Sequence, residues 1–280
     1  MATSQSLLER INQLIVSDRL ALPVFNQAVL RLQQISAQED FDSDEVERLI
    51  ISDQTLAAEV LRAANSPFYG GLSPIRTIRN AVVRLGIKQV TRLVCLASEQ
   101  SKYQAHDPQL SGMLQTLWNH ASITAFAGQW LAKRFRFNDI EEECFLGGLL
   151  HDIGQLLIIR AIDKIKKDSG PGFVLEPQVV QEVLDTAHTQ LGYTLLRRWN
   201  IPEVYCRIAQ LHHAADFDAT DLCLIIVRLA NEAAKKAGIC LKPDPGLVLS
   251  ATSEANILRT SDVLLAELEI TIEDHLGQPA

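Results

Sequence analysis

Apolar residues recur at helical spacing along almost the whole chain. The clearest stripes are Leu56, Ala57, Val60, Leu61 and Ala64, then Val90, Leu93, Val94 and Ala97, then Leu110, Met113, Leu114, Leu117, Trp118 and Ala121. Steps of three and four residues place the members of each stripe on one face of an α-helix. No alternating run of Val, Ile and Thr with hairpin turns interrupts this pattern. The pattern therefore predicts an all-α fold of roughly a dozen helices.

Capping and turn residues mark where these helices begin and end. Helix starts are indicated at Ser43, at Asp53 and at Ser261, and breaks at Pro23, Pro67, Gly86, Asp168–Gly172 and Lys242–Gly246. The amino-acid composition changes near Tyr103–Pro108, because all seven histidines lie beyond Tyr103. We therefore expect an N-terminal helical part over residues 1–105 and a histidine-bearing helical part over residues 106–280, sharing one core.

Composition and charge narrow the class of protein. Of the 280 residues 47% are apolar and 21% are charged, which excludes disordered, collagen-like and coiled-coil chains. The net charge is -8. Such a surface is unsuited as a whole to nucleic acids or anionic membranes, so we expect neither DNA nor a membrane as partner.

Three features indicate a cytoplasmic protein. The most apolar stretch, Cys144 to Ile162, is interrupted by charged and polar residues and falls short of a clean transmembrane span. Glu9 and Arg10 stand where a signal peptide needs apolar residues. The five cysteines are odd in number, widely spaced and without a CxxC motif, which favours reduced thiols in a core.

Five of the seven histidines lie in apolar, helix-forming surroundings. They are His120, His151, His188, His212 and His213. Taken singly, a core histidine is the default interpretation of His120 and His188, and the helix dipole accounts for a His pair at a helix C-terminus. Taken together with Asp152, they supply the ligands of a one- or two-metal centre. Spacing alone does not show that they converge.

Asp152 is the residue of this group whose burial costs most. It follows His151 in the run GLLHDIG, and a carboxylate there is costly to bury without a cation or hydrogen-bond donors. An Asp–His hydrogen bond is one explanation and a shared metal is the other. Adjacent helix positions diverge by about 100°, so a shared metal would have to lie between the two directions.

The stretch from about Leu22 to Ala215 resembles the HDOD family, the HD-related output domains of bacterial signalling proteins. The matching segments are IISDQTL from Ile50 (with Gln54 where the family has proline), LRAANS from Leu61, LWNH from Leu117, GLLHDIG from Gly148, WNIP from Trp199 and the pair His212-His213. The resemblance implies the all-helical fold of the HD superfamily, whose members include metal-dependent phosphohydrolases. The sister HD-GYP group hydrolyses cyclic di-GMP at a metal centre.

The resemblance also implies a ligand set. It maps the superfamily's metal ligands onto His120, His151, Asp152, His188, His212 and His213, with Asn231 at the last position. A His-rich set with one carboxylate suits Fe, Mn, Zn or Ni. The sequence departs from the active relatives in three places. Asn231 stands where an aspartate is expected, Gln155 stands where they have a phosphate-contacting lysine, and no GYP motif follows His213.

Two functions follow from the resemblance. HDOD proteins commonly lack most of these ligands and are regarded as non-catalytic output modules, so a signalling module with a partner protein, switched by metal or nucleotide, is the first hypothesis. Its input would come from another chain or a small molecule. The alternative is a metal-dependent phosphohydrolase acting on a nucleotide or cyclic nucleotide. Candidate phosphate-binding residues are Arg197, Arg198 and Arg207, although solvated helix faces are their default interpretation.

Overall fold

The computed structural model describes residues 4–16, 26–38, 40–66, 68–69, 74–170 and 173–276. Within these ranges every regular element is helical and no strand occurs, which confirms the all-α prediction. The chain divides into two compact units, one of Pro23–Lys102 and one of Met1–Leu22 with Tyr103–Ala280. Leu22 and Pro23, where the family resemblance begins, lie outside the described residues.

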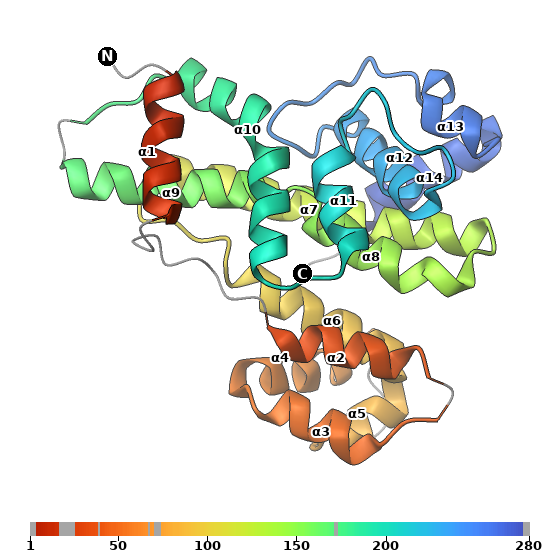
Figure 1. Ribbon diagram of the computed structural model, residues 1–280. Coiled ribbons are helices and arrows are strands. Elements are labelled where there is room, and N and C mark those ends of the chain that lie inside the picture. Colours follow the sequence, from red (N-terminus) through yellow and green to blue (C-terminus); the bar gives the residue numbers. More distant parts are fainter. Residues whose placement is uncertain are drawn as a thin grey trace. The chain divides into compact units, whose positions relative to one another are not determined.

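The described residues of the unit Pro23–Lys102 form a bundle of five helices, drawn in orange to yellow in Figure 1. They are α2 (Gln27–Ser36), α3 (Ser43–Ile51), α4 (Gln54–Ala64), α5 (Ile78–Leu85) and α6 (Ile87–Gln100). Helix α6 packs against α2, α4 and α5. The predicted stripes form the core, since Leu56, Val60 and Ala64 of α4 and Val90 and Val94 of α6 are buried.

Acidic caps start two of these helices. Helix α3 begins at Ser43 as predicted, and Asp42 just before it accepts a hydrogen bond from the backbone N–H of Asp44. Asp53 caps α4, and its Oδ1 accepts from the N–H groups of Thr55 and Leu56 at 2.9 and 3.3 Å. These bonds satisfy donors that a helix N-terminus would otherwise leave unpaired.

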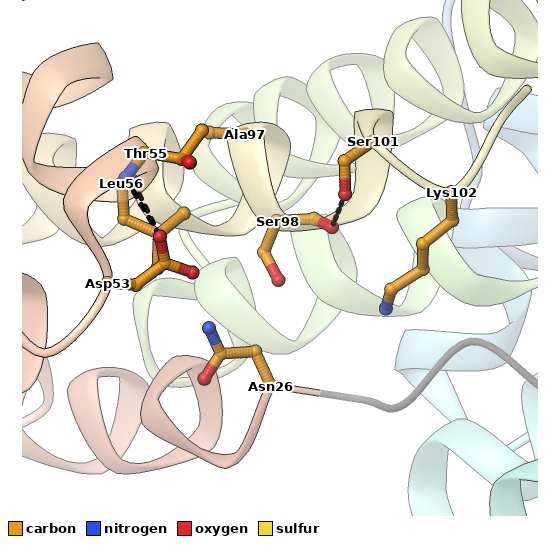
Figure 2. A pocket seen from close by; sticks show the side chains of 8 residues that line it. All are labelled: Asn26, Asp53, Thr55, Leu56, Ala97, Ser98, Ser101 and Lys102. Carbon is orange, nitrogen blue, oxygen red and sulfur yellow. Dashed lines mark hydrogen bonds between the residues drawn. The ribbon is translucent and has the colours of Figure 1, made fainter.

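A partly open pocket of about 320 Å³, lined by polar and apolar side chains, lies in this unit (Figure 2). Its walls are Asn26 before α2, the first residues of α4 and the last turn of α6. No pattern in the sequence predicts a pocket here, because its lining residues come from segments far apart in the chain.

The histidine-bearing unit contains α1 (Ser4–Val16) and all helices after residue 107 (Figure 1). The later helices are α7 (Pro108–Arg134), α8 (Glu141–Leu150), α9 (Ile153–Ser169), α10 (Pro177–Arg198), α11 (Glu203–Leu211), α12 (Leu222–Lys236), α13 (Ser253–Ile257) and α14 (Asp262–Leu276), with short 3-10 helices η1 (Asn138–Ile140) and η2 (Leu249–Ala251). Helix α8 packs against α7, α11 and α12 and is buried from Cys144 to Leu150.

Helix α1 belongs to the histidine-bearing unit, although it comes first in the chain. It contacts α9 and α10, and its apolar positions Leu7 and Ile11 are fully buried. The expected N-terminal part, residues 1–105, therefore differs from the observed division in its first helix. The apolar stripe of α1 predicts a buried face, but it does not specify which helices cover that face.

Among the described residues, only Asn138–Ser169 is long and apolar enough to cross a membrane. This stretch consists of η1, α8 and α9, and 89% of its most apolar window is buried inside the protein. Its apolar character is therefore accounted for by its place in the core.

Candidate metal centre

A break between two helices positions His151 and Asp152. Helix α8 ends at Leu150 and α9 begins at Ile153, while Asp152 has φ -102° and ψ 17°. The carboxylate of Asp152 makes no capping hydrogen bond to α9. Helical geometry is therefore interrupted at Asp152, and both side chains reach one place, with His151 Nε2 at 3.4 Å from Asp152 Oδ2. A continuous helix would direct adjacent side chains about 100° apart.

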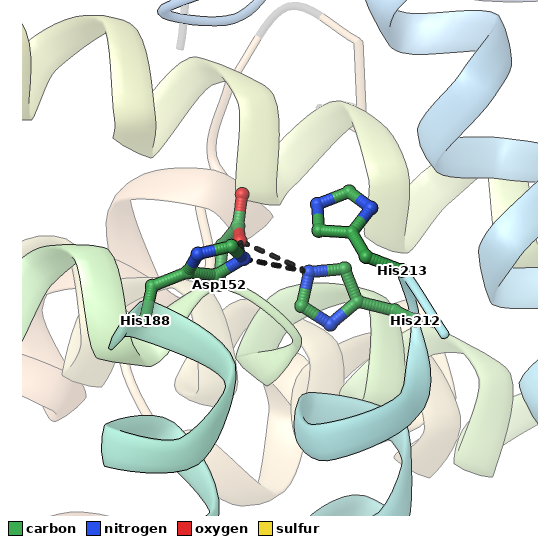
Figure 3. Close-up of side chains that lie close together, drawn as sticks. All are labelled: Asp152, His188, His212 and His213. Atoms are coloured by element: carbon green, nitrogen blue, oxygen red, sulfur yellow. Dashed lines mark hydrogen bonds and ion pairs between the residues drawn. The ribbon is translucent and has the colours of Figure 1, made fainter. Parts of the chain in front are cut away.

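Histidines from three further segments surround the Asp152 carboxylate. His120 of α7 joins His151 at Oδ2, with its Nε2 at 3.4 Å. His188 of α10 and His212 at the end of α11 place their Nε2 atoms at 3.5 and 3.3 Å from Oδ1. Figure 3 shows the Oδ1 side of this arrangement. The carboxylate thus lies between two pairs of imidazoles, and the structure brings these five side chains together.

Backbone carbonyls fix the tautomer of each of these four imidazoles. The Nδ1 atoms lie at 2.7 Å from Ile239 O for His120, 2.7 Å from Gly148 O for His151, 2.6 Å from Leu184 O for His188 and 3.0 Å from Ala209 O for His212. A carbonyl oxygen only accepts hydrogen bonds, so each Nδ1 carries a proton and donates it. In the neutral ring the lone pair is then on Nε2, and metal-binding histidines are oriented in this way.

The inward-facing atoms are consequently all acceptors. Nε2 of His120 lies 3.2 Å from Nε2 of His151, and Nε2 of His188 lies 3.3 Å from Nε2 of His212. Asp152 Oδ1 is buried and has no hydrogen-bond partner among the described residues. Buried acceptors that face one another without a donor are unfavourable unless they share a proton or a cation. The residues present therefore fit a metal ion.

Burial keeps these side chains in the protonation states that a metal requires. It lowers the pKa of His151 to about 3 against the opposing effect of Asp152, and it also lowers the pKa values of His120 and His188. Burial by itself raises the pKa of Asp152, but the surrounding histidines hold that pKa well below its usual range. At neutral pH these groups are three neutral imidazoles and one carboxylate, which favour a divalent transition metal.

Two geometric groups of ligands result, and they share Asp152. One contains His120, His151 and Asp152, and the other contains Asp152, His188, His212 and His213, with the ligand atoms of each group within 4.8 Å of one another. His213 is the exposed member, and the centroid of its ring lies 4.1 Å from the ring centroid of His212. The centre therefore has a buried half and a half that opens toward solvent.

Asn231 is the remaining predicted ligand. It is buried on α12, and its Oδ1 has no hydrogen-bond partner among the described residues. Its Nδ2 lies 3.4 Å from Glu232 Oε1. An unpaired amide oxygen is the atom an asparagine would offer a metal, and its participation stays a prediction.

Two features of the centre were not predicted from the sequence. A Cβ atom on Gly154 would lie 1.9 Å from the backbone oxygen of His188, so the start of α9 touches α10 directly and holds His188 in place. Gly192 of α10 faces Gly154 across the contact. On α12, the charge of Lys235 adds to the burial that lowers the pKa of His120. The signal for Lys235 was its position one helical turn after Asn231.

The three predicted phosphate-binding arginines have protein partners. Arg197 pairs with Glu203 at 2.6 Å and Arg207 pairs with Asp221 at 2.8 Å. Arg198 donates to the backbone oxygen of Ile15 at 3.4 Å. All three are exposed, and a role in phosphate binding stays a prediction.

Comparison with known proteins identifies the family. The model of the HDOD domain matches residues 22–215, and the chain belongs to the HDOD family. An uncharacterised protein of Treponema pallidum (strain Nichols) is 24% identical over 207 residues, which are 71% of this chain and 39% of the relative. The chain thus spans well under half the length of that relative.

Solved structures share the fold. An HDOD domain protein of Geobacter sulfurreducens aligns with a TM-score of 0.73 and 23% identity over 96% of both chains. A candidate metal-dependent phosphohydrolase of Shewanella amazonensis SB2B aligns at 0.63 and 18% identity over 98% of this chain and 99% of that one. A candidate signal transduction protein of Marinobacter aquaeolei VT8 aligns at 0.69 and 18% identity over 97% of this chain and 63% of that one.

Proposed function

We propose that this HDOD protein is a cytoplasmic regulatory module of bacterial signal transduction whose His/Asp centre holds a divalent transition metal. The observation that carries the metal is the set of inward Nε2 lone pairs around the unpaired Oδ1 of Asp152. The regulatory role is supported by the family and by the likeness to the Marinobacter protein. The output would pass to a partner protein through the helical surface.

Two sets of residues in the centre would bind the metal. His120 and His151 with Asp152 Oδ2 form one set of ligands, and His188, His212 and His213 with Asp152 Oδ1 form the other. A bound Fe, Mn, Zn or Ni ion would supply a Lewis acid there and would link α7, α10 and α11 to the α8–α9 junction. Because these ligands come from separate helices, the free energy of metal binding adds to the stability of the fold.

Elemental analysis tests the metal. The full chain, purified without chelators or a metal-affinity tag, should contain a stoichiometric amount of one of these metals, and Asp152→Ala should contain none. Asp185→Ala is the matched control, since Asp185 lies on α10 near His188 in sequence but is exposed and pairs with Lys242 at 3.0 Å. Metal-free wild-type protein that takes up none of the four ions on addition would contradict the proposal.

A metal-dependent phosphohydrolase is the second candidate. The observation in its favour is that both sets of ligands around Asp152 are complete enough to hold a metal. Against it stand Gln155, Asn231 and the absence of GYP after His213. We expect no appreciable hydrolysis of cyclic di-GMP by the metal-loaded protein. Turnover of a nucleotide with added Mn or Fe, lost in His151→Ala, would replace the regulatory proposal with an enzymatic one.

A further inference from the structure

One imidazole of the centre is not fixed in the way the other four are. His120, His151, His188 and His212 each have Nδ1 on a backbone carbonyl, whereas His213 has no such bond to any described residue. Its ring lies beside those of His188 and His212, with centroids 5.2 and 4.1 Å away (Figure 3). The position of His213 therefore depends on the backbone turn that carries it.

Arg228 of α12 holds both ends of that turn. The turn follows α11, and the N–H of Ala214 closes it by donating to the backbone oxygen of Leu211 at 3.0 Å. Nη1 of Arg228 donates to the same oxygen at 2.7 Å and to the backbone oxygen of Ala214 at 2.9 Å. These two carbonyls come directly before His212 and directly after His213. The guanidinium therefore bridges the backbone on either side of the histidine pair.

The guanidinium of Arg228 is itself held from two further sides. The side chain is only 11% exposed, and Nε donates to Oε1 of the buried Glu254 at 2.6 Å. The guanidinium carbon lies 4.1 Å from the ring centroid of Phe217. A planar guanidinium can bond a carboxylate through Nε and carbonyls through Nη1 at the same time, which the single nitrogen of a lysine cannot reproduce. The contacts of this side chain are therefore specific to arginine.

We propose that Arg228 is a positioning residue of the metal centre. Through the two carbonyls it holds the imidazole of His213 where the open half of the centre needs it, without touching the ion. His212 depends less on Arg228, because its Nδ1 is also held by the carbonyls of Ile208 and Ala209 at 3.2 and 3.0 Å. This inference rests on the proposed function, since it assigns a role toward the metal of that centre.

The dissociation constant for Zn²⁺, measured on the full chain by competition with a chelating dye, tests the inference. Arg228→Lys keeps a positive charge beside Glu254 but removes the planar fork. We expect the constant to rise at least about tenfold, the usual effect of losing a group that orients a metal ligand. Arg134→Lys is the control and should bind Zn²⁺ as the wild type does. Arg134 also pairs with a glutamate, Glu267, but it lies about four helical turns after His120 on α7.

A double-mutant cycle with His213→Ala separates positioning from a general loss of packing. The constant to follow is the one that His213→Ala raises. If Arg228 acts through His213, Arg228→Lys should raise this constant in the wild type but not in His213→Ala. Phe217→Leu removes only the ring beside the guanidinium and should act in the same way to a smaller extent. Thermal unfolding of the metal-free variants verifies that each one folds.

Three results would overturn the inference alone. They are an unchanged constant in His213→Ala, an unchanged constant in Arg228→Lys, and an equal effect of Arg228→Lys in both backgrounds. Failure of the wild type to take up Zn²⁺ or any of the other three metals would instead overturn the proposed metal centre, and this inference with it.

Discussion

One proton on each imidazole determines what the centre binds. Four carbonyl oxygens hold the Nδ1 protons of four histidines, and the lone pairs on Nε2 therefore meet around Asp152. The same rings with Nε2 protonated would instead form an ordinary hydrogen-bonded cluster with the carboxylate. The sequence identified the imidazoles and the carboxylate, but the carbonyl of Ile239, more than a hundred residues after His120, could be found only in the folded chain.

Asn231→Asp should strengthen metal binding. It would add an anionic ligand atom at a buried position where an amide oxygen now lacks a partner. We expect the dissociation constant for Mn or Zn to fall at least about tenfold, as measured by competition with a chelating dye. The control Asn119→Asp adds the same charge beside His120 at an exposed position and should have little effect. Unchanged affinity in Asn231→Asp would remove residue 231 from the ligand set.

Glu99 should make stability depend on pH. Burial raises its pKa above 4.5 in the folded chain, although Lys102 opposes that shift. In the window between pH 4.5 and the raised pKa of the folded chain, the folded state keeps a proton that the unfolded state releases. The free energy of unfolding therefore falls as pH rises through this window, by up to about 1.4 kcal/mol per pH unit. In urea titrations the free energy of unfolding of Glu99→Gln should not fall over this window, so its stability relative to the wild type should rise with pH. The surface variant Glu59→Gln should show the same pH dependence as the wild type. The same pH dependence for Glu99→Gln and the wild type would refute the assignment to Glu99.

At the scale of helices, the interruption between α8 and α9 could not be predicted from the sequence. The apolar run around GLLHDIG indicated helix on both sides, and neighbouring side chains of one helix diverge by about 100°, so a shared ion would have to lie between their directions. No proline marks the break. It arises where Gly148 lies against α7 and Gly154 lies against α10, two contacts that depend on partner helices distant in sequence. Periodicity predicts which faces are buried, but not which backbones touch.

Gly154→Ala should therefore damage both fold and centre. Its methyl group would lie 1.9 Å from the backbone oxygen of His188, so α9 and α10 would have to separate. We expect a loss of about 3 kcal/mol in the free energy of unfolding, at the upper end for overpacking, together with reduced metal content. Gly112→Ala is the control, because nothing lies within 4 Å of its added methyl group. Equal stability of the two variants would show that the glycine contact is dispensable.

At the scale of the whole molecule, charge predicts weak binding to DNA. The net charge of -8 repels a phosphate backbone, yet the segment from residue 60 to 98 has six basic residues and no acidic one. Two of them are already engaged, since Arg62 pairs with Glu59 and Arg79 with Asp44. Too few cations remain together to displace many counterions, so we expect only non-specific binding of a duplex, weaker than about 10⁻⁵ M at physiological salt. Fluorescence anisotropy with two duplexes of unrelated sequence measures this. Tight binding that falls steeply with salt and is lost in Arg76→Ala with Lys88→Ala would instead identify this segment as a nucleic-acid surface.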